Sequence, residues 1–329
     1  MCRYSQHTPL ATANPNAPPR PSAVTAPGIP NNYVLSTSCF GDRLRTIEDQ
    51  AFAAVAMGFR AIELGLSESP VPLTGFEDTR RETGVRLAAV VAGCLRPRVQ
   101  RMPCTMLSSP RDEEREQAKL SIRRHIQLAQ RLGAPFVVLR GSSIADPKMH
   151  LEAEDLSHRL SREAASDELR EEVRNFVARV QKKGQRQIDH LCRSLHSLRQ
   201  EFPETRLALE PGTQIDDLLS FEGMGWVLDD LAKQEIGYWH DVGRIHLRER
   251  AGLPSQGQWL DTYASRMVGI HLQDAADQET EMPPGLGEVD FKLIASYVPT
   301  TATRVVEVNP RHGRAELLAS VQFLNDLGI

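Results

Sequence analysis

The sequence contains no close cysteine pair, no long apolar run and little net charge. Its five cysteines are scattered over 329 residues without a CxxC pair, which speaks against both a disulfide framework and a cysteine zinc site. No apolar run approaches the roughly 20 residues that are needed to cross a bilayer. The first residues also lack the apolar block of a signal peptide. We therefore expect a protein of the reducing cytoplasm.

The charge balance limits the classes of partner. A net charge of −4 gives no long-range attraction to phosphate backbones, so it argues against general binding to nucleic acids or anionic membranes. A small polar or anionic metabolite is compatible with it. Hydrophobic residues make up 40% of the chain, enough for one substantial core.

Residues 1–32 differ in composition from the rest of the chain. They hold seven of the 21 prolines and few large apolar residues. Such a segment buries too little surface to offset the entropy lost on ordering. We expect residues 1–32 to form a disordered, Pro-rich N-terminal tail.

From residue 33 onward, short apolar runs alternate with helical patterns. The predicted strands lie at 33–36, 60–65, 86–91, 136–139, 207–210, 236–241, 267–271 and 305–307. The longest connection, between residues 141 and 205, carries one apolar stripe at helical spacing and predicts a long helix, bent at Gly184, on the barrel wall. Eight strands alternating with helices favour a single (β/α)8 TIM barrel over residues 33–329 rather than an open doubly wound sheet.

Four residues that bear acid or base groups end successive predicted strands. They are Glu210, Asp241, His271 and Glu307, separated by 31, 30 and 36 residues, which is the length of one strand plus one helix. The carboxyl ends of parallel strands converge on one mouth of a barrel. Three carboxylates at one half-buried point are costly without a cation, so the pattern predicts a divalent metal and hence a metal-dependent enzyme.

Each of these residues has an ordinary structural interpretation when it is taken alone. A carboxylate at a strand end often caps a helix or pairs with arginine, and a single histidine is commonly structural. Four of them at successive strand ends favour function. Oxygen-rich ligation with one imidazole suits Mn²⁺, Mg²⁺, Co²⁺ or Zn²⁺ and leaves two octahedral positions for neighbouring substrate oxygens.

Local patterns around these residues carry a resemblance to a known family. They are Leu207-Ala208-Leu209-Glu210, His240-Asp241-Val242-Gly243, His271-Leu272-Gln273-Asp274, Val305-Val306-Glu307-Val308-Asn309-Pro310 and the loop Pro284-Gly285-Leu286-Gly287-Glu288-Val289-Asp290-Phe291. The loop is similar to the family's Pro-Gly-x-Gly-x-Ile-Asp-Phe segment. In this order and spacing, the patterns resemble the xylose isomerase-like TIM-barrel superfamily, which includes sugar phosphate isomerases and epimerases.

The resemblance implies a function and assigns roles. It makes Glu210, Asp241, His271 and Glu307 the ligands of one divalent metal, with Glu210 and Glu307 also the acid and base. The implied activity is isomerisation or epimerisation of a small sugar, sugar phosphate or polyol ketone through an enediolate. The resemblance also implies a homo-oligomer.

Four further residues are candidates for substrate contact. Glu63 ends the second strand and could instead pair with a neighbouring strand. Arg140 and Arg244 could hold an anionic group through forked hydrogen bonds, or could offset the acids at the mouth. Asp274 could orient a ligand or cap a loop. His240 alternates away from the barrel axis and is expected to pack between strands and helices.

Two departures from the family pattern and three competing functions remain. Arg244 stands where many members have histidine, and Gln273 stands where many have lysine. A lyase or dehydratase would begin with the same proton abstraction. A non-catalytic sugar-binding protein would not need the acidic mouth. A nuclease with a three-metal cluster is disfavoured because the predicted third and fourth strands end without histidine.

Overall fold

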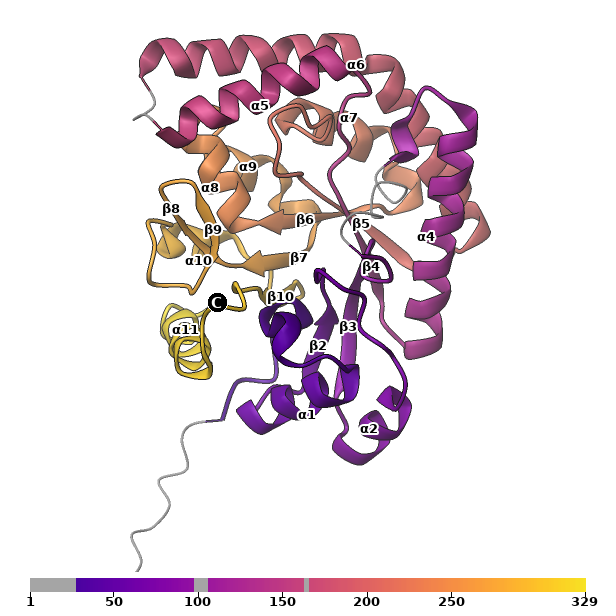
Figure 1. Cartoon of the computed structure of the whole chain (residues 1–329), viewed down its shortest axis with the longest axis vertical. Helices are drawn as coiled ribbons and strands as arrows, with labels where there is room; N and C mark the ends of the chain where they lie inside the picture. The colour runs from indigo at the N-terminus through magenta and orange to yellow at the C-terminus, as the bar shows by residue number, and fades with distance from the viewer. Residues whose placement is uncertain (1–27, 98–105, 163–165) are drawn as a thin grey trace, which may run out of the picture.

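A closed barrel of eight parallel strands lies at the centre of the computed structural model, which describes residues 28–97, 106–162 and 166–329 (Figure 1). The barrel confirms the predicted (β/α)8 architecture. Its strands pair in the order β1-β10-β7-β6-β5-β4-β3-β2, and β1 closes the ring on β2. They are β1 (Tyr33–Ser36), β2 (Ala61–Leu64), β3 (Arg86–Val91), β4 (Phe136–Arg140), β5 (Arg206–Glu210), β6 (Gly237–Asp241), β7 (Met267–Leu272) and β10 (Thr303–Val306).

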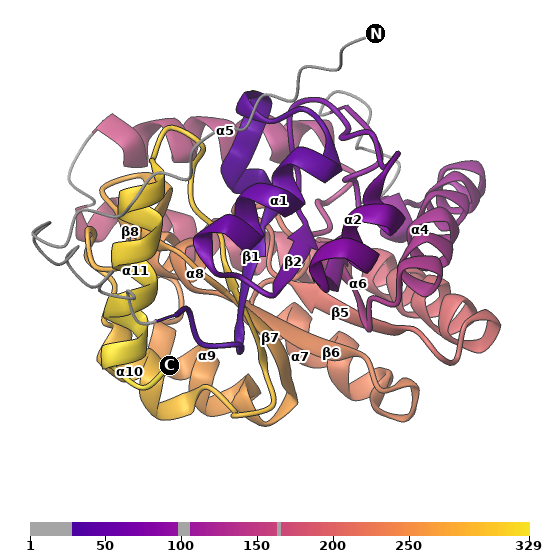
Figure 2. The ribbon, with the colours of Figure 1, turned by 90° about the horizontal axis from the view of Figure 1, so that it is seen from below.

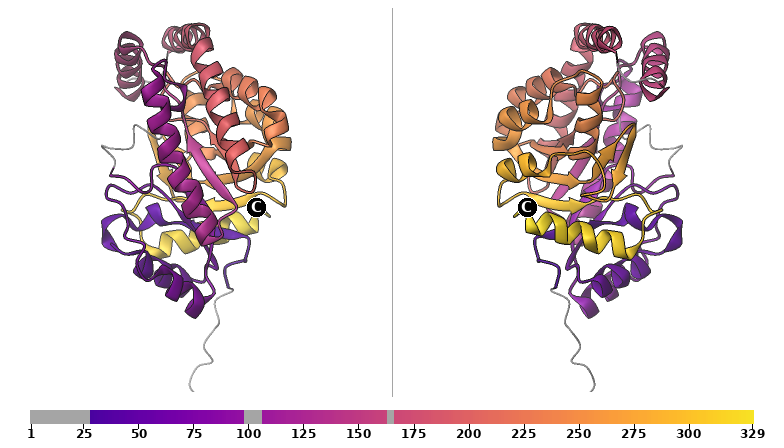
Figure 3. Two further views of the ribbon diagram at one scale, coloured as in Figure 1. Left: turned by 90° about the vertical axis from the view of Figure 1, so that its right-hand side faces the viewer. Right: turned by 90° about the vertical axis from the view of Figure 1, so that its left-hand side faces the viewer.

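Helices surround the strands on the outside of the barrel (Figures 2 and 3). Those of the described residues are α1 (Ile47–Met57), α2 (Phe76–Thr83), α4 (Asp112–Leu132), α5 (Pro147–Arg162), α6 (Asp167–Glu201), α7 (Phe221–Asp230), α8 (Val242–Arg250), α9 (Gln256–Tyr263), α10 (Phe291–Tyr297) and α11 (Arg314–Asp326). Short 3-10 turns lie at η1 (Thr37–Arg43), η3 (Met106–Ser108), η4 (Ala232–Gln234) and η5 (Ala264–Arg266). Helix α1 has a cap at each end, since Thr46 accepts the Asp49 N–H and Gly58 ends the helix in the left-handed conformation.

The long connection before β5 forms two helices: α6 is the long helix that the apolar stripe predicts, and α5, which precedes it, was not predicted. In Figure 1, α5 and α6 run side by side along the upper edge of the molecule. Ser166 caps the start of α6 by accepting the Leu169 N–H. The helix continues through Gly184, where a side chain would meet Leu218 at 2.2 Å. The predicted bend at Gly184 is therefore not an interruption of the helix, and the glycine is explained by its close packing against Leu218.

A small antiparallel hairpin, β8 (Asp274–Ala276) with β9 (Glu279–Met282), extends the chain beyond β7. The sequence did not predict it, because these short, largely polar strands lack an apolar alternation. The hairpin contacts α8. Consequently it forms part of the wall on the side of the barrel where the carboxyl ends of the strands lie.

The barrel interior is filled below these strand ends. Trp239 on β6 is fully buried there and packs edge-on against Phe136, with ring centroids 5.9 Å apart. A side chain at Gly269 would lie 2.2 Å from the Trp239 ring, so glycine is required on β7 for the indole to fit. The tryptophan forms a floor directly beneath the strand-end residues.

Residues 1–27 of the predicted tail lie outside the described residues. Ile29, within the predicted tail, packs against the hydrophobic core. Among the described helices, none is both long enough and apolar enough to span a membrane.

Candidate active site

Strand register brings the predicted residues to one mouth of the barrel. Arg140 at the end of β4 lies opposite Glu210 on β5, and Asp241 on β6 lies opposite His271 on β7. Glu307 directly follows β10, and its N–H bonds to the β7 carbonyl of Leu272 at 3.3 Å. The four residues of the predicted quartet are all buried. Their convergence follows from parallel strands in register.

The guanidinium of Arg140 lies between the two predicted acid/base residues. Its Nε donates to Glu210 Oε2 at 2.7 Å, and its Nη2 donates to both carboxylate oxygens of Glu307 at 2.8 Å. The same Nη2 lies 3.4 Å from each ring nitrogen of His271. Only 11% of the Arg140 side chain is exposed. Of the two interpretations that the sequence left open for Arg140, its contacts match the neutralisation of nearby acids.

Two further donors connect Asp241 to its neighbours. Arg244 forms ion pairs with Asp241 Oδ2 at 2.9 Å and with Glu210 Oε1. Its backbone N–H bonds to Asp241 Oδ1 at 2.9 Å, so the same carboxylate caps α8. Gln273 Nε2 donates to Asp241 Oδ2 at 2.9 Å and to Glu307 Oε2 at 3.3 Å. Both departures from the family pattern therefore contact the predicted metal ligands.

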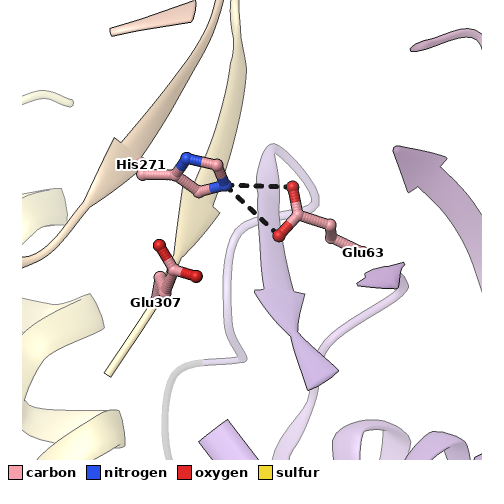
Figure 4. Close-up of side chains that lie close together, drawn as sticks. All are labelled: Glu63, His271 and Glu307. Carbon is pink, nitrogen blue, oxygen red and sulfur yellow. Dashed lines mark hydrogen bonds and ion pairs between the residues drawn. The ribbon is translucent and has the colours of Figure 1, made fainter. Parts of the chain in front are cut away.

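Both ring nitrogens of His271 have partners. The Trp239 indole N–H donates to Nδ1 at 2.9 Å, and because an indole can only donate, Nδ1 is the acceptor. On the other side of the ring, Nε2 lies 3.0 Å from Glu63 Oε2 (Figure 4). Ser36 on the adjacent strand donates to Glu63 Oε1 at 3.0 Å and holds this carboxylate in place. Glu63 thus pairs across the barrel mouth, which the sequence did not predict.

The arginines determine the ionisation of the two glutamates. Burial alone would raise the pKa of Glu210, but Arg140 and Arg244 outweigh it and hold that pKa well below the usual range. Burial is likewise outweighed at Glu307, where Arg140, His271 and Arg244 lower the pKa. Both carboxyls are therefore ionised at neutral pH, as an acceptor of a proton must be.

Asp241 and His271 shift in the opposite direction. Burial raises the pKa of Asp241 to about 7, against the effect of Arg244 and with a contribution from Glu210. Burial by itself would lower the pKa of His271. The negative charges of Glu63, Glu210 and Glu307 outweigh burial and raise this pKa well above its ordinary value. This shift favours the protonated ring, whereas the Trp239 N–H opposes a proton on Nδ1. The proton on Nε2, facing Glu63, is present in either form.

A cavity of about 280 Å³ opens beside the two arginines. Arg140 and Arg244 line it together with residues of the segments after β4 and β5. The remaining lining residues are Leu66, Ala92, Gly141, Ser142, Ser143, Gly212, Thr213, Gln214 and Asp217. Its volume is close to the lower end of the range for small-molecule sites.

Within the described residues, two groups have the chemistry of a metal site. One is Glu63, His271 and Glu307, and the other is Glu210, Asp241 and His271; within each group the ligand atoms lie within 4.8 Å of one another. However, these atoms already serve as hydrogen-bond partners of Arg140 or other protein groups. Arg140 Nη2 lies between Glu307 and His271, where an ion shared by them would sit. In this arrangement the residue types suit a metal, but the space does not.

Other residues singled out in the sequence have structural contacts. Asp274 accepts backbone N–H groups from Gly285, Gly287 and Val289, which is the loop-cap alternative for that residue. His240 bonds to Tyr238 and Gln256 on the outside of the strand, as predicted.

Sequence reasoning missed four residues that contact or adjoin the quartet. Trp239 and Ser36 are common strand residues, and Gln273 was treated only as a departure. Glu281, on β9, has its pKa raised by burial and by the charge of Glu307. Its proximity depends on the hairpin, so no local pattern could have indicated it.

Comparison with known proteins identifies the family to which this architecture corresponds. The family model described as xylose isomerase-like TIM barrel matches residues 52–327. Among curated protein sequences, none matches this chain.

Several solved structures share the fold. The 3-keto-D-glucoside 4-epimerase YcjR from E. coli has a TM-score of 0.60 at 16% identity, over 90% of this chain and 99% of the other. The D-psicose 3-epimerase of Clostridium cellulolyticum H10 has a TM-score of 0.61 at 12% identity, over 90% and 98%. The IOLI protein, solved with a zinc atom, has a TM-score of 0.56 at 11% identity, over 90% and 97%. At these identities the likeness concerns the fold.

Proposed function

Since the chain belongs to the xylose isomerase-like TIM barrel family, we propose that it is an isomerase or epimerase of a small sugar, sugar phosphate or polyol ketone. One observation carries the proposal. Two buried, ionised glutamates at the ends of β5 and β10 share one guanidinium, and that guanidinium lines a cavity of small-molecule size. Sugar epimerases among the structural neighbours support the choice of substrate class.

The proposed reaction transfers a proton next to a carbonyl. Glu210 or Glu307 removes the proton from the carbon beside the C=O group, and the C–H electron pair forms the carbon–carbon double bond of an enediolate. The other glutamate, or the same one, then returns a proton to carbon. Return to the opposite face gives the epimer. Return to the neighbouring carbon, with transfer of the hydroxyl proton from one enediolate oxygen to the other, gives the isomer.

Positive charge must face the two oxygens of the enediolate while it exists. Arg140 and Arg244 line the cavity and carry such charge in a fixed position. The sequence predicts a divalent ion bound by Glu210, Asp241, His271 and Glu307, and this ion stays a prediction. The position of Arg140 argues against it, so no step of the proposed reaction depends on an ion.

Solvent deuterium provides the test. A panel of ketoses, keto sugars and inososes is incubated with the protein in D₂O, and incorporation of deuterium at carbon is followed by NMR. We expect exchange with at least one substrate. A Glu210→Gln or Glu307→Gln variant should slow it by about 10²–10⁴-fold, the usual contribution of an acid/base group.

Three outcomes would contradict this assignment. Near-normal exchange in the glutamine variants would remove the two glutamates from the reaction. Loss of water from the substrate would identify the lyase or dehydratase alternative instead. Tight binding of a sugar without any exchange would identify a binding protein.

A further inference from the structure

The three strand-end carboxylates are connected by protein donors in the positions where a metal would connect them. Arg140 joins Glu210 to Glu307 through Nε and Nη2, at 2.7 and 2.8 Å. A shared ion would be held at about 2.0–2.2 Å from each carboxylate oxygen. The ion and the Arg140 side chain therefore cannot occupy this space together.

The other two pairs of carboxylates are connected in the same way. Arg244 Nη1 pairs with both Glu210 and Asp241. Gln273 Nε2 bonds to both Asp241 and Glu307. Each of the three possible pairs is thus bridged by a different side chain.

His271 does not offer a free lone pair either. Nδ1 accepts the Trp239 N–H at 2.9 Å, and Nε2 points its proton at Glu63. Coordination by either nitrogen would require one of these bonds to break. The indole packs against Phe136 and fills the space beside Gly269. Trp239 therefore has little room to move away from His271.

Protein cations offset part of the negative charge without an ion. The argument for a cation from the sequence considered the acids together with one imidazole, and it left open whether Arg140 and Arg244 offset them. The structure places both guanidinium groups among the acids, with only 11% and 8% of the side chain exposed. They face four carboxylates, those of Glu63, Glu210, Asp241 and Glu307. Buried charges are stable only when paired and hydrogen-bonded, and these are.

We infer that the guanidinium groups of Arg140 and Arg244 take the place of a divalent ion in this barrel, so that the centre functions without a resident metal. Arginine suits this role because its planar fork of N–H donors remains charged at any physiological pH and matches two neighbouring oxygens. The statement that the arginines serve the reaction in place of an ion rests on the proposed function. The statement that they exclude a metal ion from the site does not depend on it.

Metal binding without substrate provides the test. The wild-type chain, expressed with added Mn²⁺ and purified without chelator, is analysed for metal content and then titrated with Co²⁺, whose visible absorption reports coordination by protein ligands. The variants are Arg140→Met, which opens the space, and Arg43→Met, which removes an exposed arginine whose hydrogen bonds within the described part of the chain go to the carbonyls of Phe40 and Cys39.

We expect far less than one ion per wild-type chain and no Co²⁺ spectrum for wild type or Arg43→Met. Arg140→Met should gain the spectrum at about one ion per chain, with an affinity at least about a hundredfold higher, because a like charge no longer fills the site. About one tightly held ion in the wild-type chain would overturn the inference. So would a folded Arg140→Met variant that gains no affinity.

The wild-type measurement decides the question even if Arg140→Met does not fold. Arg140→Lys then serves as the second variant, since it keeps the charge and should exclude the ion as the wild type does. Because these measurements use no substrate, they can fail while the proposed reaction holds, and deuterium exchange can fail while they succeed.

Discussion

Removing the Arg140 guanidinium should destabilise the barrel in a pH-dependent way. In the wild type, Arg140 helps to hold the pKa values of Glu210 and Glu307 below their ordinary range, although burial acts against it. The stability from this interaction is fully present above the unfolded glutamate pKa of about 4.3 and is lost as the pH falls below it. In Arg140→Met, burial is opposed only by Arg244 and His271, so both pKa values should rise.

The sign of the pH dependence follows from that rise. A carboxyl whose pKa is raised in the folded state contributes stability at low pH and loses it as the pH increases. Breaking a buried ion pair by removing one partner costs about 3–5 kcal/mol. We expect a loss of this size near pH 8 for Arg140→Met and a clearly smaller one near pH 5, where a glutamate takes up a proton.

Urea unfolding at pH 5 and pH 8, in buffer freed of metal beforehand, measures the difference. Arg140→Lys is the control, because it keeps the charge and should show a smaller loss that is nearly independent of pH. Adding Mn²⁺ at a hundred times its dissociation constant should restore about 2.7 kcal/mol to Arg140→Met and nothing to the wild type. An equal loss at both pH values would refute the account of Arg140 as the counter-charge of these glutamates.

Two further predictions test the scaffold around the site. Gly269→Ala should lower stability by about 1–3 kcal/mol by overpacking and shift the fluorescence of Trp239, because the new methyl group meets the indole at 2.2 Å. The control is Gly257→Ala, whose new methyl group has its nearest neighbouring atom at 3.8 Å and which should be neutral or stabilising. Equal effects of the two variants on the melting temperature would contradict this. The hydrogen bond to Asp216 raises the pKa of His150. His150→Gln should therefore be less stable than wild type below about pH 6.5 and equally stable once the pH has risen past the pKa of His150 in the folded protein. A difference in urea midpoint that does not change with pH would show that the His150–Asp216 pair does not stabilise the fold.

The fold was accessible from the sequence because parallel-barrel strands are short apolar runs bounded by polar residues. The run at Arg86–Val91 matches β3 residue for residue. The long helix α6 was predicted from its apolar stripe, but α5 was missed because that stripe does not reveal that a second helix precedes α6. The hairpin of β8 and β9 was missed because its strands are too short and too polar to show a period.

The convergence of the strand-end quartet was also accessible, but its chemistry was not. Spacing places Glu210 and Glu307 at the same barrel mouth, and the structure brings them together. Spacing does not tell where a long arginine side chain points. Arg140 reaches Glu307 across the barrel from β4 to β10, two strands far apart in sequence. The sequence left open whether Arg140 holds a substrate anion or offsets the acids, and only side-chain positions decide between the two.

Anomalous diffraction from a crystal of the wild-type protein grown with Mn²⁺ tests the central claim most directly. The account predicts Arg140 Nη2 bonded to both oxygens of Glu307, as at 2.8 Å here, with no anomalous peak among the strand-end carboxylates. A manganese peak coordinated by Glu210, Asp241, His271 and Glu307, with Arg140 turned away, would contradict it.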